Sequence, residues 1–326
     1  MQRRTLFNIM RAGISLAVIS ALVWFMRGQL GTVWHIIRQA DRGLLALSFV
    51  IAAFSVILIG VRLRIIIAAQ GLTLQLRDAV YLVFIGYFFN NFLPTAVGGD
   101  MVKAYYLAKK TNKKLASLAC VILDRFVGSF TLMLLALIAF LAMKRSITSS
   151  TVSVFVLVAA LIFGFAAAIL FSRRMLKKFP WIKALLKRFR MYEKARAMHE
   201  VIYNYKKQPM ALLNALLLSV FLQMITFTGM YFIIRSLGYS VSLVTLFLLM
   251  PLVVIASMAP SINGLGVRES CFVVLFGPIM SREGALAFGI LYFIMYFAFS
   301  LAGGVVYAFG GHNRITLSDI KKAEVA

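Results

Sequence analysis

The chain has 326 residues, of which 62% are hydrophobic and 14% charged, and its 35 lysines and arginines outnumber its 10 aspartates and glutamates. This composition excludes an ordinary soluble globular protein and predicts an all-α polytopic membrane protein. A formal net charge of +25 would suggest a nucleic-acid partner in a soluble protein. In a membrane protein it indicates basic cytoplasmic loops instead, so we expect no nucleic acid to bind.

Several segments are long and apolar enough to cross a membrane as helices, for which about 20 residues are needed. The first of them follows an N-terminus with no small-residue cleavage site, so we expect a retained span rather than a removed signal peptide. The expected full spans are six, at residues 9–26, 43–61, 120–143, 152–171, 210–235 and 284–309.

Two further regions, residues 78–110 and 242–282, are apolar but interrupted. In the first, a run of about 15 apolar residues stops at Pro94 and continues through PTAVGGDMVK. In the second, an apolar run stops at Pro260 and continues through PSINGLGVRE. Glycines after each proline are expected to turn the backbone before a helix restarts. Both regions therefore predict re-entrant helical hairpins.

The distribution of basic residues predicts the orientation of the chain. If the N-terminus is cytoplasmic and each hairpin returns to its own side, 25 of the 35 lysines and arginines lie in cytoplasmic segments. This bias obeys the positive-inside rule and predicts a multi-pass protein of the cell inner membrane with both termini in the cytoplasm. The two hairpins then enter from opposite faces, which is typical of an inverted-topology repeat.

The chain is expected to form one transmembrane domain over residues 1–326. A basic stretch at residues 172–208 joins its two halves; it predicts either an amphipathic segment on the inner leaflet, with Trp181, Phe189 and Tyr192 among its anchors, or a solvated loop that only sets the topology. The expected parts are a first half at 1–171, the linker at 172–208, a second half at 209–311 and a cytoplasmic tail at 312–326.

Charged residues at the hairpin tips would each cost about 2.5 to 3.5 kcal/mol at the membrane centre, so we expect them to face one another or a watery cavity. Each restarting helix, near Asp100 and at Arg268, would present free amide groups towards the membrane centre. Together with Lys103 and Arg268, these ends would form a receptor for an anionic group such as a lipid phosphate.

Structural roles stay open for the same residues. Asp100 could be only a helix N-cap, and Lys103 could extend to the cytoplasmic interface. Asp124 and Arg125, near the start of a span, could be an ordinary interfacial pair. Arg268 and Glu269 are neighbours whose side chains should diverge by about 100° on a helix. They are therefore not expected to neutralise each other, and structural pairing with Asp124 and Asp100 is the alternative.

The expected translocation site combines both hairpin tips with the Asp-Arg pair. Titration of Asp100 and Glu269 would additionally allow proton coupling. The candidate substrate-binding residues are Asn91, Thr95, Gly98, Gly99, Asp100, Lys103, Asp124, Arg125, Ser261, Asn263, Gly264, Gly266, Arg268 and Glu269.

No pattern typical of catalysis is visible. The two cysteines are expected to be buried reduced thiols, and the three histidines are scattered without metal-ligand spacing. No nucleophile-base pair or nucleotide-binding loop stands out, so we expect neither an enzyme nor a cofactor or metal. The residues concerned are Cys120, Cys271, His35, His199 and His312.

Three segments in this order, FFNNFLPTAVGGDMVKAYYLAKK, VILDRFVGSFTLMLL and PSINGLGVRES, resemble the transmembrane flippase region of lysylphosphatidylglycerol synthases. The resemblance covers roughly residues 8–310. It implies transport of aminoacylated phospholipid, glycolipid or another polar lipid between leaflets, with Asp100, Arg125, Arg268 and Glu269 at matching positions. The full-length synthases carry a soluble transferase domain after this region, whereas the sequence stops at residue 326. We therefore expect no lipid synthesis by this chain.

The sequence thus predicts a lipid flippase that passes a polar or anionic headgroup between the two hairpin tips by alternating access. The main alternative is a non-catalytic membrane subunit that presents a phospholipid or polyprenyl-linked donor to a separate transferase. An ion channel or small-solute transporter of the same design is a third. Membrane lipids are the expected partners, and a partner lipid synthase or glycosyltransferase and a homo-oligomer stay open.

Overall fold

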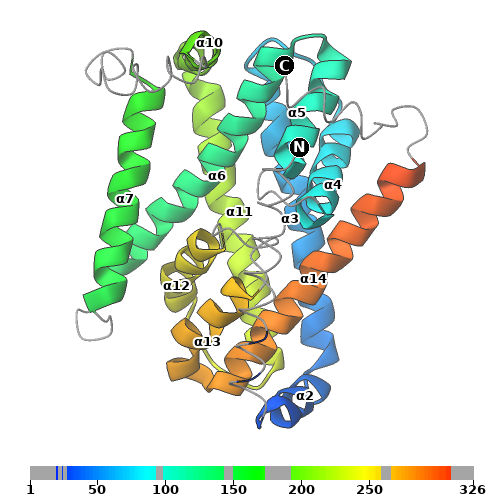
Figure 1. The fold of residues 1–326 in the computed structure, drawn as a ribbon, viewed down its shortest axis with the longest axis vertical. Coiled ribbons are helices and arrows are strands. Elements are labelled where there is room, and N and C mark those ends of the chain that lie inside the picture. The colour runs from blue at the N-terminus through cyan, green and yellow to red at the C-terminus, as the bar shows by residue number, and fades with distance from the viewer. Residues whose placement is uncertain are drawn as a thin grey trace.

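The computed structural model describes residues 20, 24, 28–92, 98–142, 150–172, 192–257 and 266–309. These residues form helices joined by short connections, with no β-strand among them (Figure 1). In chain order the elements are α2 (Leu30–Arg38), α3 (Arg42–Ala68), α4 (Leu76–Phe92), α5 (Gly98–Thr111), α6 (Lys114–Ala142), α7 (Ser150–Leu170), α10 (Tyr192–Tyr203), the 3-10 turn η1 (Asn204–Lys207), α11 (Pro209–Ser236), α12 (Leu243–Ala256), α13 (Val267–Met280) and α14 (Arg282–Phe309).

Four of these helices, α3, α6, α11 and α14, are long and apolar enough to cross a membrane. They coincide with four of the predicted spans, and the 21-residue helix α7 coincides with a fifth. The remaining predicted span, 9–26, lies almost wholly outside the described residues. Many large apolar side chains on these helices are exposed, such as Leu141 at 72% and Leu161 at 73%. Such surfaces fit contact with lipid, so the chain is an all-α, multi-pass membrane protein.

Both interrupted regions form pairs of packed helices. α4 ends at Phe92, before Pro94, and α5 begins at Gly98; α12 ends at Ala256 and α13 begins at Val267. The connections at 93–97 and 258–265 lie outside the described residues. In Figure 1, α4 and α5 lie in the upper part of the molecule, together with α10, and α12 and α13 lie in the lower part, together with α2.

The buried apolar residues form two clusters. One joins α3, α4, α5 and α6 around residues such as Leu63 and Ile85. The other joins α6, α11, α12, α13 and α14 around residues such as Phe272 and Phe288. Met295 of α14 packs against both clusters. Each helix pair therefore has its own core, and α14 connects the two.

Glycines allow helix α4 to approach its neighbours closely. A Cβ atom added at Gly303 of α14 would lie 2.1 Å from the Phe84 carbonyl oxygen of α4. One added at Gly60 of α3 would lie 2.6 Å from the Val80 side chain. Small residues at such contacts are typical of packed transmembrane helices, where close backbone approach provides the van der Waals energy.

The structure corrects the end of the second predicted span. The predicted span ended at residue 61, but α3 continues to Ala68, and Arg62 within it is only 6% exposed. The reason is an ion pair, described below, which lets the charge remain buried. The short helix α2 was also not predicted, because its nine residues are too few to stand out as a span.

The linker is described only at its C-terminal end, so its predicted anchors Trp181 and Phe189 lie outside the described residues. That end is docked onto the helices. His199 of α10 hydrogen-bonds the Ile169 carbonyl oxygen at 2.9 Å, and the hydroxyl of the buried Tyr205 donates to the Ile66 carbonyl oxygen at 3.0 Å. Burial raises the pKa of Tyr205, so this phenol stays neutral and can act as the donor.

Candidate functional site

The first charged cluster lies where α5 begins. Asp100 is buried, and its carboxylate forms ion pairs with Arg125 of α6 and, at 3.3 Å, with the Lys103 ammonium one turn further along α5. We call these three residues the Asp100 group. Asp100 is the third residue of α5 and therefore not its N-cap. The Lys103 side chain is only 14% exposed, so it does not extend to an interface. Both structural alternatives for these residues are wrong.

Gly98 and Gly99 do not turn the chain, contrary to the sequence prediction, because both lie inside α5 and neither has a positive φ angle. Gly99 instead allows α5 to touch α4. An added Cβ there would lie 2.2 Å from the Gly86 carbonyl oxygen, and the Gly99 amide donates to Asn90 Oδ1 at 2.9 Å. A Cβ added at Gly86 would in turn lie 2.0 Å from Lys103 Cε. The glycines therefore set the position of the Asp100 group against α4.

Replacing Gly99 by alanine is expected to destabilise the protein by about 1 to 3 kcal/mol, because the new methyl group would push against the backbone of α4. Gly164→Ala is the matched control, since Gly164 of α7 has no heavy atom within 4 Å of an added Cβ. Unfolding in mixed detergent micelles measures both. A Gly99→Ala protein as stable as the control would contradict this packing role.

A second cluster joins three long helices. Arg62 of α3 donates from Nε and Nη2 to the two carboxylate oxygens of Asp124 in α6, at 2.8 and 3.2 Å. Its Nη1 donates to the Ser219 hydroxyl of α11 at 3.1 Å. Gly128 makes room for the guanidinium, because a Cβ there would lie 2.8 Å from Nη1. We call Arg62, Asp124 and Ser219 the Arg62 group.

Asp124 and Arg125 are therefore not a pair with each other; their side chains bind partners on different helices. Arg62 is the buried charged residue that the sequence analysis left out of its candidates. One signal could have shown it: the segment LRIIIAA after Arg62 is again strongly apolar, which indicates that the helix continues.

The third cluster lies at the start of α13 and corrects another prediction. Arg268 and Glu269 do neutralise each other: Nε and Nη2 of Arg268 donate to Glu269 Oε1 at 3.1 and 2.7 Å. We call them the Arg268 pair. The expected divergence of 100° describes only where the two side chains leave the helix, and both are long enough to bend towards each other.

Gly266 holds the carboxylate of this pair. Its φ angle of 83° is in the left-handed region, and its amide donates to Glu269 Oε2 at 2.7 Å. Tyr292 and Phe293 of α14 lie 5.5 Å from the Arg268 guanidinium carbon, each measured at the ring centroid. The predicted turn at Gly266 is thus confirmed, and Arg268 is enclosed by a carboxylate and two rings.

The structure distributes the predicted site residues over these clusters. Asn91 lies in the last turn of α4, next to Asn90, which binds Gly99. The Asp100 group joins the first helix pair to α6, and the Arg268 pair belongs to the second helix pair. Asp124 lies in the interior of the helix bundle. Four predicted residues lie outside the described part of the chain: Thr95, Ser261, Asn263 and Gly264.

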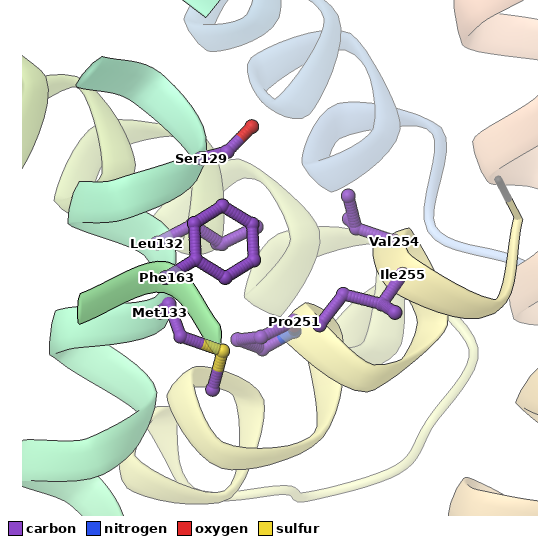
Figure 2. Close-up of a pocket in the computed structure, with 7 residues that line it drawn as sticks. All are labelled: Ser129, Leu132, Met133, Phe163, Pro251, Val254 and Ile255. Carbon is purple, nitrogen blue, oxygen red and sulfur yellow. The ribbon is translucent and has the colours of Figure 1, made fainter. Parts of the chain in front are cut away.

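A pocket between α6, α7 and α12 contains none of the predicted residues (Figure 2). It is a small gap with room for about one water molecule, and its lining is apolar apart from Ser129. Phe163 of α7 and Pro251 of α12 face each other across it in the close-up. This pocket has no charged side chain to receive a polar headgroup, so it is distinct from the charged clusters.

The charges of the clusters are not equally balanced. The Arg62–Asp124 and Arg268–Glu269 pairs each combine one cation with one anion. The Asp100 group combines two cations with one carboxylate, and the Arg125 side chain is 37% exposed. Counted over these three side chains alone, the group carries one net positive charge, which would attract an anionic ligand.

Comparison with protein families gives one match. The family model described as the lysylphosphatidylglycerol synthase TM region matches residues 13–304, which include every charged cluster described above. A comparison with curated proteins found no match.

Proposed function

The chain belongs to the family of lysylphosphatidylglycerol synthase transmembrane regions, which associates it with lipid handling, and from that premise we propose that it moves a polar or anionic lipid between leaflets. The observation that carries this proposal is the Asp100 group. Its three side chains together carry one net positive charge next to the start of α5, where the helix dipole adds a positive potential. A lipid phosphate would bind there and its acyl tails would stay in the bilayer.

In this proposal α4–α5 and α12–α13 are re-entrant hairpins that enter from opposite faces, with six full spans around them. Their positions in opposite halves of the molecule support the arrangement (Figure 1). The Arg268 pair would open when a headgroup reaches α13, so that the guanidinium binds the phosphate and Glu269 keeps its bond to the Gly266 amide. Alternating access would follow from exchanging protein ion pairs for pairs with the headgroup.

Translocation by the purified protein alone tests this function. Liposomes containing only this protein and tail-labelled phosphatidylglycerol are expected to show movement of the label between leaflets, measured by quenching of the outer leaflet. A subunit that presents a lipid to a separate transferase would not move the label without its partner. Liposomes whose label stays in one leaflet would therefore overturn the proposal.

Within this assay, Arg125→Gln is expected to slow translocation of phosphatidylglycerol about tenfold, because one charge-assisted contact of the headgroup is lost. Arg64→Gln is the matched control: Arg64 lies on the same kind of helix, but it is exposed and outside the Asp100 group. Equal rates in the two variants would remove Arg125 from the site.

Cysteine labelling tests the orientation. In a background without Cys120 and Cys271, single cysteines at Lys110 and Tyr192 are expected to react with an impermeant maleimide only from the cytoplasm. One at Ser281 is expected to react only from the opposite side. Lys110 lies at the C-terminal end of the first hairpin, so labelling there from outside would mean that α4 and α5 cross the membrane once.

A further inference from the structure

A row of tyrosines lies between the first and second helix pairs. The Arg268 guanidinium lies 5.5 Å from the ring centroid of Tyr292, and that ring lies 4.9 Å from the ring of Tyr296. Tyr296 in turn contacts Tyr87 of α4, at 5.6 Å between centroids and nearly perpendicular. We call Tyr87, Tyr292 and Tyr296 the tyrosine row. It runs without interruption from α13 across α14 to α4.

The other end of the row lies beside the remaining charged clusters. Tyr87 packs against the first apolar cluster, which includes Leu63, the residue after Arg62. The residue before it, Gly86, is the one against which the Lys103 side chain packs. The row therefore connects the Arg268 pair at one end with the surroundings of the Asp100 and Arg62 groups at the other.

The hydroxyl groups distinguish this row from ordinary packing. Tyr292 and Tyr296 are four residues apart and so lie on the same face of α14. Tyr87 contacts Tyr296 from α4, so three phenol rings on two helices form one series of contacts. Elsewhere the same helix packs with phenylalanine, as in the stacked rings of Phe293 and Phe297. Packing alone would not require hydroxyls on this face, since phenylalanine fills nearly the same volume.

We propose that the tyrosine row is the hydrogen-bonding track along which a lipid headgroup passes between the Asp100 group and the Arg268 pair. This inference rests on the proposed function and specifies its path. A phosphate or hydroxyl group that leaves one charged cluster would lose its hydrogen bonds in a hydrocarbon environment. Phenol hydroxyls replace those bonds without adding a charge, so the headgroup is not held too tightly. The three tyrosines are therefore positioning residues for lipids with hydrogen-bonding headgroups.

The test removes hydroxyls and keeps the rings. The Tyr292→Phe/Tyr296→Phe protein is expected to move tail-labelled phosphatidylglycerol about tenfold more slowly than the wild type, with an unchanged melting temperature. Tyr81→Phe is the matched control, because Tyr81 is also on α4 and makes a perpendicular ring contact, but with Tyr106. It is expected to leave the rate unchanged.

Equal translocation by the wild type and the double variant would overturn the inference and leave the proposed function intact. If the wild type moves no lipid, the proposed function is wrong. The role of the tyrosine hydroxyls is then tested by lipid binding instead of translocation. Tail-labelled phosphatidylglycerol is then expected to bind the double variant in detergent about tenfold more weakly than the wild type, and equal binding overturns the role of the hydroxyls. If the double variant melts at a lower temperature than the wild type, the single variants Tyr87→Phe and Tyr296→Phe replace it. Each is compared with the wild type in translocation rate and lipid binding, and equal values overturn the role of the hydroxyls.

Discussion

Replacing Arg62 by leucine is expected to lower the free energy of unfolding by about 3 to 5 kcal/mol, the largest loss of stability that we predict for a single substitution in this chain. Arg62 is 6% exposed and Asp124 is 7% exposed. Without the guanidinium, the Asp124 carboxylate would stay buried between α3, α6 and α11 with no cation to neutralise it. Unfolding in mixed detergent micelles is the measurement.

The double variant Arg62→Leu/Asp124→Leu is the control for this prediction. It removes both charges and fills the space with apolar atoms, so its stability is expected to return to within about 1 kcal/mol of the wild type, or above it. Ser219→Ala should cost only about 1 kcal/mol, because the ion pair itself remains. If the double variant were as unstable as Arg62→Leu, loss of helix packing and not an orphaned charge would be the cause.

Replacing Arg268 by alanine is expected to reduce lipid translocation to the background rate. The Arg268 guanidinium can bind a phosphate at two points, whereas the Glu269 carboxylate would repel it. The substitution therefore removes the cation that faces Tyr292. Arg268→Lys keeps the charge but not the planar fork, so it should retain a measurable but substantially lower rate. Leaflet quenching in liposomes distinguishes the three proteins.

The stability of the Arg268 variants must be measured together with their transport rate. Among the described residues, alanine at position 268 leaves the Glu269 carboxylate with the Gly266 amide as its one hydrogen-bond donor. The double variant Arg268→Met/Glu269→Gln removes both charges and is expected to fold like the wild type while moving no lipid. Wild-type translocation by this double variant would exclude Arg268 from the mechanism. A folding defect confined to Arg268→Ala would show that the pair also stabilises the start of α13.

Hydropathy and charge were enough to predict the class of the fold. The length of apolar runs and the prolines and glycines between them depend only on local sequence, and four long helices and both interruptions lie where they were expected. The charged candidates Asp100, Arg268 and Glu269 were also visible, because a charge within an apolar segment is rare enough to stand out.

The partners of those charges were decided by the tertiary structure. The sequence separated Arg268 from Glu269 and left Asp124 beside Arg125, whereas the folded chain pairs the first two and gives Asp124 to Arg62, 62 positions away. A side chain's partner depends on how each helix is rotated and how closely it approaches the next, and hydropathy carries no information about either quantity.

The same reason explains what the sequence could not show about the glycines and the tyrosine row. Gly98 and Gly99 resemble turn residues in any sequence, but in the fold Gly99 allows α5 to touch the α4 backbone. Tyr87 and Tyr296 lie more than 200 residues apart along the chain and meet only because α4 and α14 pack together. Hydropathy and charge by themselves indicated a protein that crosses a membrane and carries charged residues within its apolar segments. Helix packing decided which side chains meet there, because only packing sets the distances between them.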